Sequence, residues 1–358
     1  MITYYGQQST GIETVLRQLN PDMAMNIGVI HWWSTWDGPI QEMERFVDGV
    51  DICFVVSDEI LCNSIIHGKF GGWVKLQSQF DMLDQDKVHF ILHSDEPLMP
   101  NSNRCFNVPW FAKTPVTNYN VEAWDYVDKQ YTFNMLLGSE KDHRTHLFLA
   151  FKDNKNIYST YFGHNGLKNI SDKHLEDEDV LNNLQGQVTF DRKINTLEEV
   201  NESTISHTTP QAIYDNSHFD IVSETHIDDD FFFTTEKTAK PLAAGRWFLP
   251  YTSRNQSSYL ERYGFDFSDY RHDEYDVKDK MHRLELTIQK IEEISEDNGL
   301  VRQIYSETRE NRIHNAHVYK QVTKKYMESL TFFILDALSI PGQERTKILE
   351  VMLRRDWH

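Results

Sequence analysis

The chain is poor in cysteine. Its 358 residues include only Cys53, Cys62 and Cys105. Three cysteines at these spacings form neither a disulfide framework nor a zinc knuckle. We therefore expect them to pack in the core as small apolar side chains.

Long apolar runs are also missing. No stretch approaches the ~18 consecutive apolar residues of a membrane-spanning helix. The N-terminal residues lack the basic and apolar segments of a secretion signal. The sequence therefore predicts a cytoplasmic protein without a membrane partner.

Positive charge is scarce as well. The chain has 36 basic and 55 acidic residues, which gives a net charge of −19. This balance argues against nonspecific binding of a long polyanion, although a local basic groove remains compatible with it. Nor does this charge exclude an enzyme that releases an anionic product. The length is enough for roughly two domains of ~150 residues.

Residues 1–125 have the pattern of an α/β domain. The segments 51–57 and 88–93 are continuous apolar runs, as in buried parallel strands. Together with strand patterns at 2–5 and 26–31 and a helical face at 12–19, they predict βαβ crossovers and a Rossmann-like N-terminal domain. Ligands of such sheets bind beyond the carboxyl ends of the strands.

A second α/β domain is predicted over residues 126–275. The stretch 108–126, with two prolines, is a candidate linker, and residues 164–216 are a polar, partly helical insertion. Residues 276–358 are predicted to form a helical extension. Its expected apolar stripes contain Met281, Leu284, Ile288 and Ile291, then Phe332, Ile334, Leu335 and Leu338.

The segment Thr234–Pro241 is the most informative part of the chain. It lies between two predicted strands and opens a predicted helix. A threonine there is a plausible N-cap, and the first amides of the helix, with Lys237, favour an anion. Glu236 offers a carboxylate to the hydroxyls of a ribose. The alternative is a solvated helix start with an ordinary Glu–Lys pair.

A similar pattern occurs at Gly138–Arg144, where a strand, a glycine turn and a helix follow one another. Arg144 offers a forked donor to a phosphate. The alternative is a surface arginine. The presence of two such segments in one α/β domain strengthens the interpretation of each as a phosphate-binding segment.

The N-terminal half offers candidates for acid–base chemistry and for stacking. Asp95 and Glu96 follow a buried-type strand, and Asp37 is a reserve. Each is a candidate general base, and each is alternatively a helix cap or a turn former. Three tryptophans could stack on a base or a sugar ring or pack between domains: Trp32, Trp33 and Trp36.

The adjacent acids Asp228, Asp229 and Asp230 are the one run suggesting a divalent metal. A solvated turn is the favoured interpretation of this run. We therefore expect no metal site.

The C-terminal half resembles a known family over about residues 130–275. Glu224-Thr225, then Phe233–Thr238, Lys240-Pro241-Leu242 and Gly245 are similar to the donor-binding region of fucosyltransferase-like glycosyltransferases. The segment Asp142–Leu147 resembles the early C-terminal-domain segment of the same group. The sequence of Phe231–Lys240 is also similar to that of phage-type glycosyltransferases, some of which add arabinose or glucose to hydroxymethylated cytosines in DNA.

This resemblance implies a GT-B-like α/β fold, in which two Rossmann-like domains face a cleft and helices follow at the C-terminus. Glu236 would bind the ribose, Lys237 and Arg144 the diphosphate, and Glu224 would line the same pocket. The full set of implied donor-binding residues is Arg144, Glu224, Glu236, Lys237, Lys240, Thr235 and His143.

The implied activity is metal-independent transfer of a sugar from a nucleotide-diphosphate donor, with UDP favoured, to a hydroxyl bound by the N-terminal domain. Duplex DNA with 5-hydroxymethylcytosine is one implied acceptor. If a phage encodes the protein, it would then act in the cytoplasm of the host cell. A glycan or a lipid-linked sugar is the alternative acceptor. A non-catalytic nucleotide-binding protein is the alternative from another class.

Overall fold

The computed structural model describes residues 2–5, 12, 16, 25–32, 40–57, 86–93, 104–113, 125–137, 141–151, 153–161, 211–227, 232–274, 276–340, 342 and 345–346. The chain divides into two compact units. The first consists of Met1–Pro115 with Gln321–His358, and the second of Val116–Lys320.

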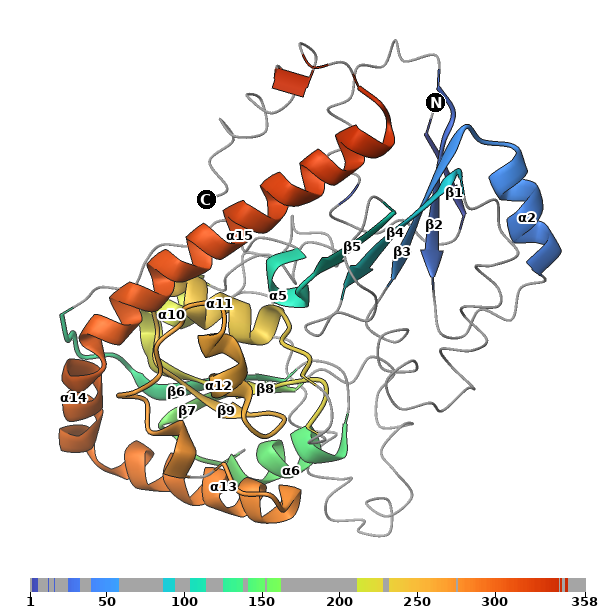
Figure 1. Ribbon diagram of the computed structural model, residues 1–358. Helices are drawn as coiled ribbons and strands as arrows, with labels where there is room; N and C mark the ends of the chain where they lie inside the picture. The colour runs from blue at the N-terminus through green and yellow to red at the C-terminus, as the bar shows by residue number, and fades with distance from the viewer. Residues whose placement is uncertain are drawn as a thin grey trace, which may run out of the picture. The chain divides into compact units, whose positions relative to one another are not determined.

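The first unit contains a five-stranded sheet in which every pairing is parallel (Figure 1). The strands lie in sequence order: β1 (Ile2–Tyr5), β2 (Ile27–Trp32), β3 (Ile52–Ser57), β4 (Val88–His93) and β5 (Cys105–Val108). The parallel sheet predicted from the apolar runs is confirmed. Strand β5 was not predicted, because four residues are too few to show a pattern.

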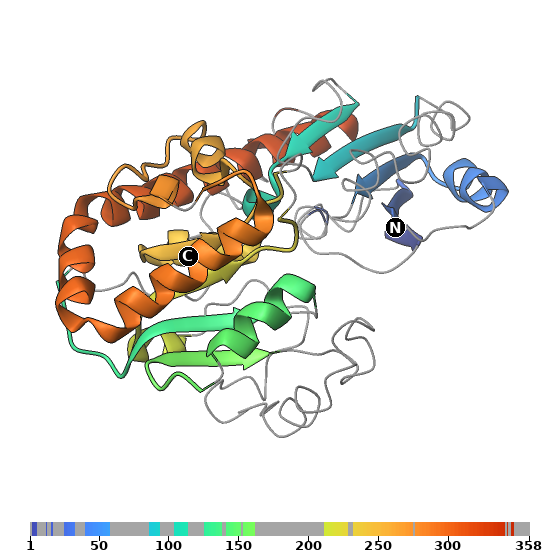
Figure 2. The same ribbon diagram turned by 90° about the horizontal axis from the view of Figure 1, so that it is seen from below.

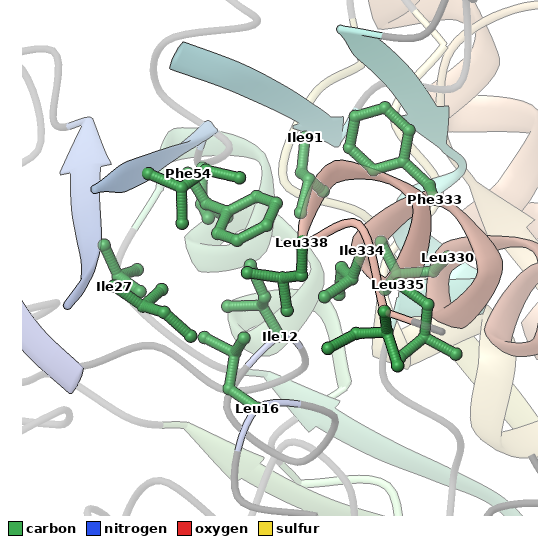
Figure 3. Packing of buried hydrophobic residues seen from close by; sticks show 14 of the residues in the cluster. Ile12, Leu16, Ile27, Phe54, Ile91, Leu330, Phe333, Ile334, Leu335 and Leu338 are labelled. Atoms are coloured by element: carbon green, nitrogen blue, oxygen red, sulfur yellow. The ribbon is translucent and has the colours of Figure 1, made fainter. Parts of the chain in front are cut away.

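One face of this sheet packs against the end of a long helix, α15 (Arg309–Ala337). Figure 3 shows the strand residues Ile27, Phe54 and Ile91 in one apolar cluster with helix side chains. The labelled residues from the C-terminal segment are Leu330, Phe333, Ile334, Leu335 and Leu338. Burial of this cluster removes apolar surface from water and stabilises the unit.

Helix α2 (Ile40–Asp48) packs at Gly28 of β2. A Cβ atom on Gly28 would lie 2.8 Å from the Phe46 ring and 3.0 Å from Val50. The glycine therefore allows close approach of helix and strand.

The predicted linker at 108–126 contains a short helix, α5 (Trp110–Lys113). Phe111 and Ala112 in this helix are buried. The first unit accordingly continues to Pro115, and the boundary lies before the predicted position at 125.

The second unit contains a four-stranded, all-parallel sheet in the order β7-β6-β8-β9. Its strands are β6 (Tyr131–Leu137), β7 (Ile157–Tyr161), β8 (Ser217–Ser223) and β9 (Phe248–Tyr251). The chain adds β7 on one side of β6 and then β8 on the other. The carboxyl ends of β6 and β8 therefore form a topological switch point, where open α/β sheets bind ligands.

Helices cover both faces of this sheet (Figure 1). On one face lie α10 (Gln211–Asn216) and α11 (Glu236–Ala244), and on the other lie α6 (Asp142–Phe151) and α13 (Lys280–Glu296). Figure 2 shows α13 lying across its face of the sheet. Helix α12 (Gln256–Glu261) and the short 3-10 helix η3 (His272–Glu274) follow β9.

The C-terminal helices continue through α14 (Asn298–Glu307) into α15. The expected extension at 276–358 is divided between the two units at residue 320. Two predicted core positions are wrong, since Met281 is 49% exposed and Phe332 is 47% exposed. Phe333 is buried in place of Phe332.

The protein is therefore a mixed α/β protein with parallel sheets and C-terminal helices. Core packing is confirmed for Cys53 and Cys105, which are buried thiols outside any disulfide. Burial raises the pKa of the Cys53 thiol to about 12 and that of Cys105 to about 11. Cys62 lies outside the described residues. None of the described helices is both long enough and apolar enough to span a membrane.

Candidate anion-binding site at the carboxyl end of β8

Helix α11 begins at a capped N-terminus. Thr235 has extended backbone angles, and its hydroxyl oxygen accepts a hydrogen bond from the Lys237 amide at 3.3 Å. This confirms the predicted threonine cap. The helix ends at Gly245, whose φ of 67° lies in the left-handed region that glycine adopts without steric cost.

Glu224, directly after β8, holds this N-terminus in place. Its Oε1 accepts hydrogen bonds from the Thr235 amide at 2.9 Å and the Thr238 hydroxyl at 2.6 Å. Its Oε2 accepts from the Thr235 hydroxyl at 2.6 Å. The side chain is 0% exposed. Glu224 was predicted to line a donor pocket, but here it is a positioning residue that fixes α11 to the end of β8.

Lys237 and Glu236 lie on the first turn of α11 and remain accessible. Lys237 Nζ donates to Glu236 Oε1 at 2.7 Å and to Thr235 Oγ1 at 3.2 Å. The two side chains are 19% and 24% exposed, respectively. The Glu–Lys pair of the alternative interpretation therefore exists, and buried Glu224 and Thr235 hold it in place.

The charges of this helix start act on one another. Burial alone would raise the pKa of Glu236, but the nearby charges of Lys237 and Lys240 lower it to about 2. Glu236 is therefore an ionised acceptor at neutral pH. Burial lowers the pKa of Lys240 to about 8, although Glu236 acts in the opposite direction. Lys240 thus titrates just above neutral pH.

The first turn of α6 joins the same strand end. His143 Nε2 donates to the Glu224 carbonyl at 3.0 Å, and the Arg144 guanidinium donates to the Ser223 carbonyl at 3.3 Å. Burial and the neighbouring Arg144 charge lower the pKa of His143 to about 3, so its ring is neutral. Arg144 is 1% exposed, which excludes the surface-arginine alternative.

The seven predicted donor-binding residues thus lie around the end of β8. Hydrogen bonds and charge interactions link the set Arg144, His143, Glu224, Thr235, Glu236, Lys237 and Lys240. Sequence reasoning did not identify Thr238, which is buried and bonds Glu224. The sequence feature that could have identified Thr238 is its position three residues after the capping Thr235, on the first turn of the helix.

The N-terminal candidates are not tested by this geometry. Asp37, Asp95, Glu96, Trp33 and Trp36 lie outside the described residues, as do Asp228, Asp229 and Asp230. Trp32 is the last residue of β2. No group of three potential metal ligands occurs among the residues that the structure describes.

The cluster has groups for an anion and for an adjacent diol of the same ligand. Lys237 and the helix start supply positive potential for the anion, while ionised Glu236 supplies a hydrogen-bond acceptor for the diol.

Neither protein-family models nor curated proteins match this chain.

Proposed function

We propose that the protein is a glycosyltransferase that moves a sugar from a nucleotide-diphosphate donor, with UDP favoured, to an acceptor hydroxyl. The observation that carries the proposal is the partly exposed Lys237–Glu236 pair at the start of α11. Buried Glu224 fixes this pair at the carboxyl edge of a parallel sheet, where such sheets bind ligands.

Lys237 is the residue proposed to contact the diphosphate. Its ion pair with Glu236 is partly solvated, and such pairs contribute only about 0–1 kcal/mol. A diphosphate can therefore replace Glu236 as its partner at little cost. The fixed positive charge then stabilises the negative charge that develops on the leaving diphosphate.

Glu236 is the proposed ribose ligand. Its lowered pKa keeps it ionised, so both of its oxygens accept hydrogen bonds from a vicinal diol. Arg144 adds positive potential from beneath the site, where it holds Ser223. Direct contact between Arg144 and a phosphate is a prediction from the resemblance.

The acceptor half of the reaction needs a base that removes the hydroxyl proton. Asp95 or Glu96 is proposed for this role, with Asp37 in reserve, and the tryptophans at 32, 33 and 36 for stacking. Duplex DNA with 5-hydroxymethylcytosine is the proposed acceptor, on the resemblance alone. A glycan or lipid-linked acceptor is the alternative.

Calorimetric titration with UDP tests the donor site. Lys237→Ala should weaken UDP binding about 10-fold to 100-fold, as expected for a charge-assisted hydrogen bond. Lys324→Ala removes an equal charge from an exposed position on α15 and should bind like the wild type. Equal UDP affinity in all three proteins would contradict the assignment.

Transfer assays test the reaction class. Wild-type protein is incubated with UDP-glucose or UDP-arabinose and either hydroxymethylcytosine duplex or oligosaccharide acceptors. Modified DNA supports the proposed acceptor, and a modified glycan supports the alternative. UDP binding without turnover on any acceptor would favour the non-catalytic nucleotide-binding protein.

A further inference from the structure

A cavity of about 250 Å³ opens at the carboxyl end of β9. Its walls come from the residues after β9, from α12, from η3 and from the first turns of α13. Pockets for drug-sized ligands have volumes of about 300–1,000 Å³, so this smaller cavity suits a single ring and is too small for a whole sugar nucleotide. None of the seven residues of the anion-binding cluster lines it.

Three hydroxyl groups of the cavity lining donate their protons to other groups of the protein. Thr252 donates to the Ser253 carbonyl at 3.1 Å, and Ser253 donates to the His226 carbonyl at 3.5 Å. Ser257 donates to Nδ1 of His272 at 2.7 Å. The hydroxyl oxygens of Thr252 and Ser257 therefore present lone pairs to a ligand.

The tautomer of His272 follows from its other contact. Nε2 lies 2.9 Å from the Phe248 carbonyl and must donate to it, so Nδ1 is the acceptor. Burial lowers the pKa of His272 to about 4, so this neutral tautomer persists at neutral pH. The direction of the Ser257 hydroxyl is thereby fixed.

Gln256 is a buried polar residue of the lining whose side-chain oxygen has no hydrogen-bond partner within the described part of the chain. Its side chain lines the cavity and is 5% exposed. Nε2 donates to the Thr234 hydroxyl at 3.1 Å, but within the described part of the chain no donor reaches Oε1. A buried carbonyl without a donor is costly, and a ligand hydroxyl would satisfy it.

The charges around the cavity disfavour an anion. Glu261, Asp273 and Asp276 contribute carboxylates to the lining. The one cation among the lining residues is Arg283, whose guanidinium donates to the carbonyls of residues 227, 277 and 278. A phosphate in this cavity would lie beside hydrogen-bond acceptors and carboxylates, which would repel it.

We propose that this cavity binds an uncharged monosaccharide ring. Acceptors converge on it from several elements, as a ring with hydroxyls in several directions requires. Phe267 and Pro250 add apolar surface for the C–H face of the ring. The ring is either a free monosaccharide or the glycosyl group of a larger molecule, and the site goes beyond the proposed donor-binding role of Lys237 and Glu236.

Saturation-transfer NMR and calorimetry with D-glucose and D-arabinose test the site. Gln256→Met removes the acceptor and keeps the side-chain length, and it should weaken sugar binding about 5-fold to 10-fold, the effect of one hydrogen bond. Gln303→Met on the exposed face of α14 is the matched control and should bind sugar like the wild type. Ser258→Trp, at an exposed lining position, should block binding without disturbing buried groups.

Two further arms separate the sources and the two sites. UDP-glucose that competes with free glucose in wild type identifies a glycosyl group as the occupant, whereas glucose bound undisturbed by UDP-glucose identifies a free monosaccharide. Gln256→Met should bind UDP normally, so failure of the sugar site is distinguishable from failure of the donor site. The proposal would be overturned if no sugar bound, or if Gln256→Met bound sugar as tightly as the wild type. It would also be overturned if the cavity bound ethanolamine, a small cation that the carboxylates of the lining could attract, in place of sugar.

Discussion

Two glutamates that the sequence pattern treats alike have different environments. Glu224 is fully buried and makes three hydrogen bonds to the start of α11, whereas Glu236 is partly exposed and pairs with Lys237. The sequence places Glu236 near a ligand because it opens a predicted helix, and the family resemblance places Glu224 in the same pocket. Their roles could not be separated without the tertiary structure, since burial depends on how β8 and α11 pack.

Glu224→Gln tests the positioning role. The amide keeps the size of the side chain but replaces a charged acceptor with a neutral one and turns one oxygen into a donor. Hydrogen bonds to charged groups are worth about 1.5–3 kcal/mol, so we expect the free energy of unfolding to fall by about 2 kcal/mol in urea denaturation. Glu285→Gln on the exposed face of α13 should leave it unchanged. Equal stabilities of the two variants would rule the role out.

Lys240 predicts a pH dependence of nucleotide binding. Its pKa is lowered from 10.5 to about 8 by burial, and a bound diphosphate would raise it again. Below about pH 8 the ammonium is already charged and affinity is constant. Above it, binding must take up a proton, so UDP affinity should fall by up to about tenfold per pH unit. Calorimetry across this window measures the fall, and Lys240→Met should abolish it; an unchanged slope in the variant would contradict the prediction.

At the scale of elements, long apolar runs were the reliable signal. Strands β3 and β4 were predicted because their residues are mostly apolar, as in a buried parallel strand, and α11 because a threonine cap precedes it. Strand β5 and helix α5 have four residues each, too few for periodicity. In α15, Phe332 and Phe333 are adjacent, and only the packing shows which of them faces the sheet.

The buried ion pair Arg246–Asp220 joins the segment between α11 and β9 to strand β8. Arg246 Nε lies 2.5 Å from Asp220 Oδ2, with exposed fractions of 0% and 5%. Arg246→Met would leave the Asp220 carboxylate buried without its charge partner, and breaking such a pair costs about 3–5 kcal/mol. Urea unfolding followed by tryptophan fluorescence measures the loss, because Trp247 lies in the adjacent core.

Two further variants sharpen this measurement. Asp220→Asn combined with Arg246→Met removes both charges and should recover part of the loss. Arg302→Met breaks a solvated pair with Asp128 and should change stability by about 0–1 kcal/mol. If Arg246→Met behaves like Arg302→Met, the buried pair does not stabilise the unit.

At the scale of the whole molecule, alternating strand and helix patterns predicted two parallel α/β sheets, and both are present. The sequence could not predict that the C-terminal helices are divided between the two units, because a helical pattern does not specify its partner. The arrangement of two Rossmann-like domains about a cleft stays a prediction. The candidate site was predictable in the second unit, where short motifs mark helix starts, whereas the proposed base and stacking residues at 33–37 and 95–96 lie outside the described residues.

A crystal structure of the protein with UDP would show directly where the nucleotide binds. We expect the diphosphate at the N-terminus of α11, within hydrogen-bond distance of Lys237 Nζ, and the ribose hydroxyls on the Glu236 carboxylate. We also expect the Glu224 hydrogen bonds to Thr235 and Thr238 to be unchanged. UDP bound elsewhere, with the Lys237–Glu236 pair intact, would show that the start of α11 is not the donor site.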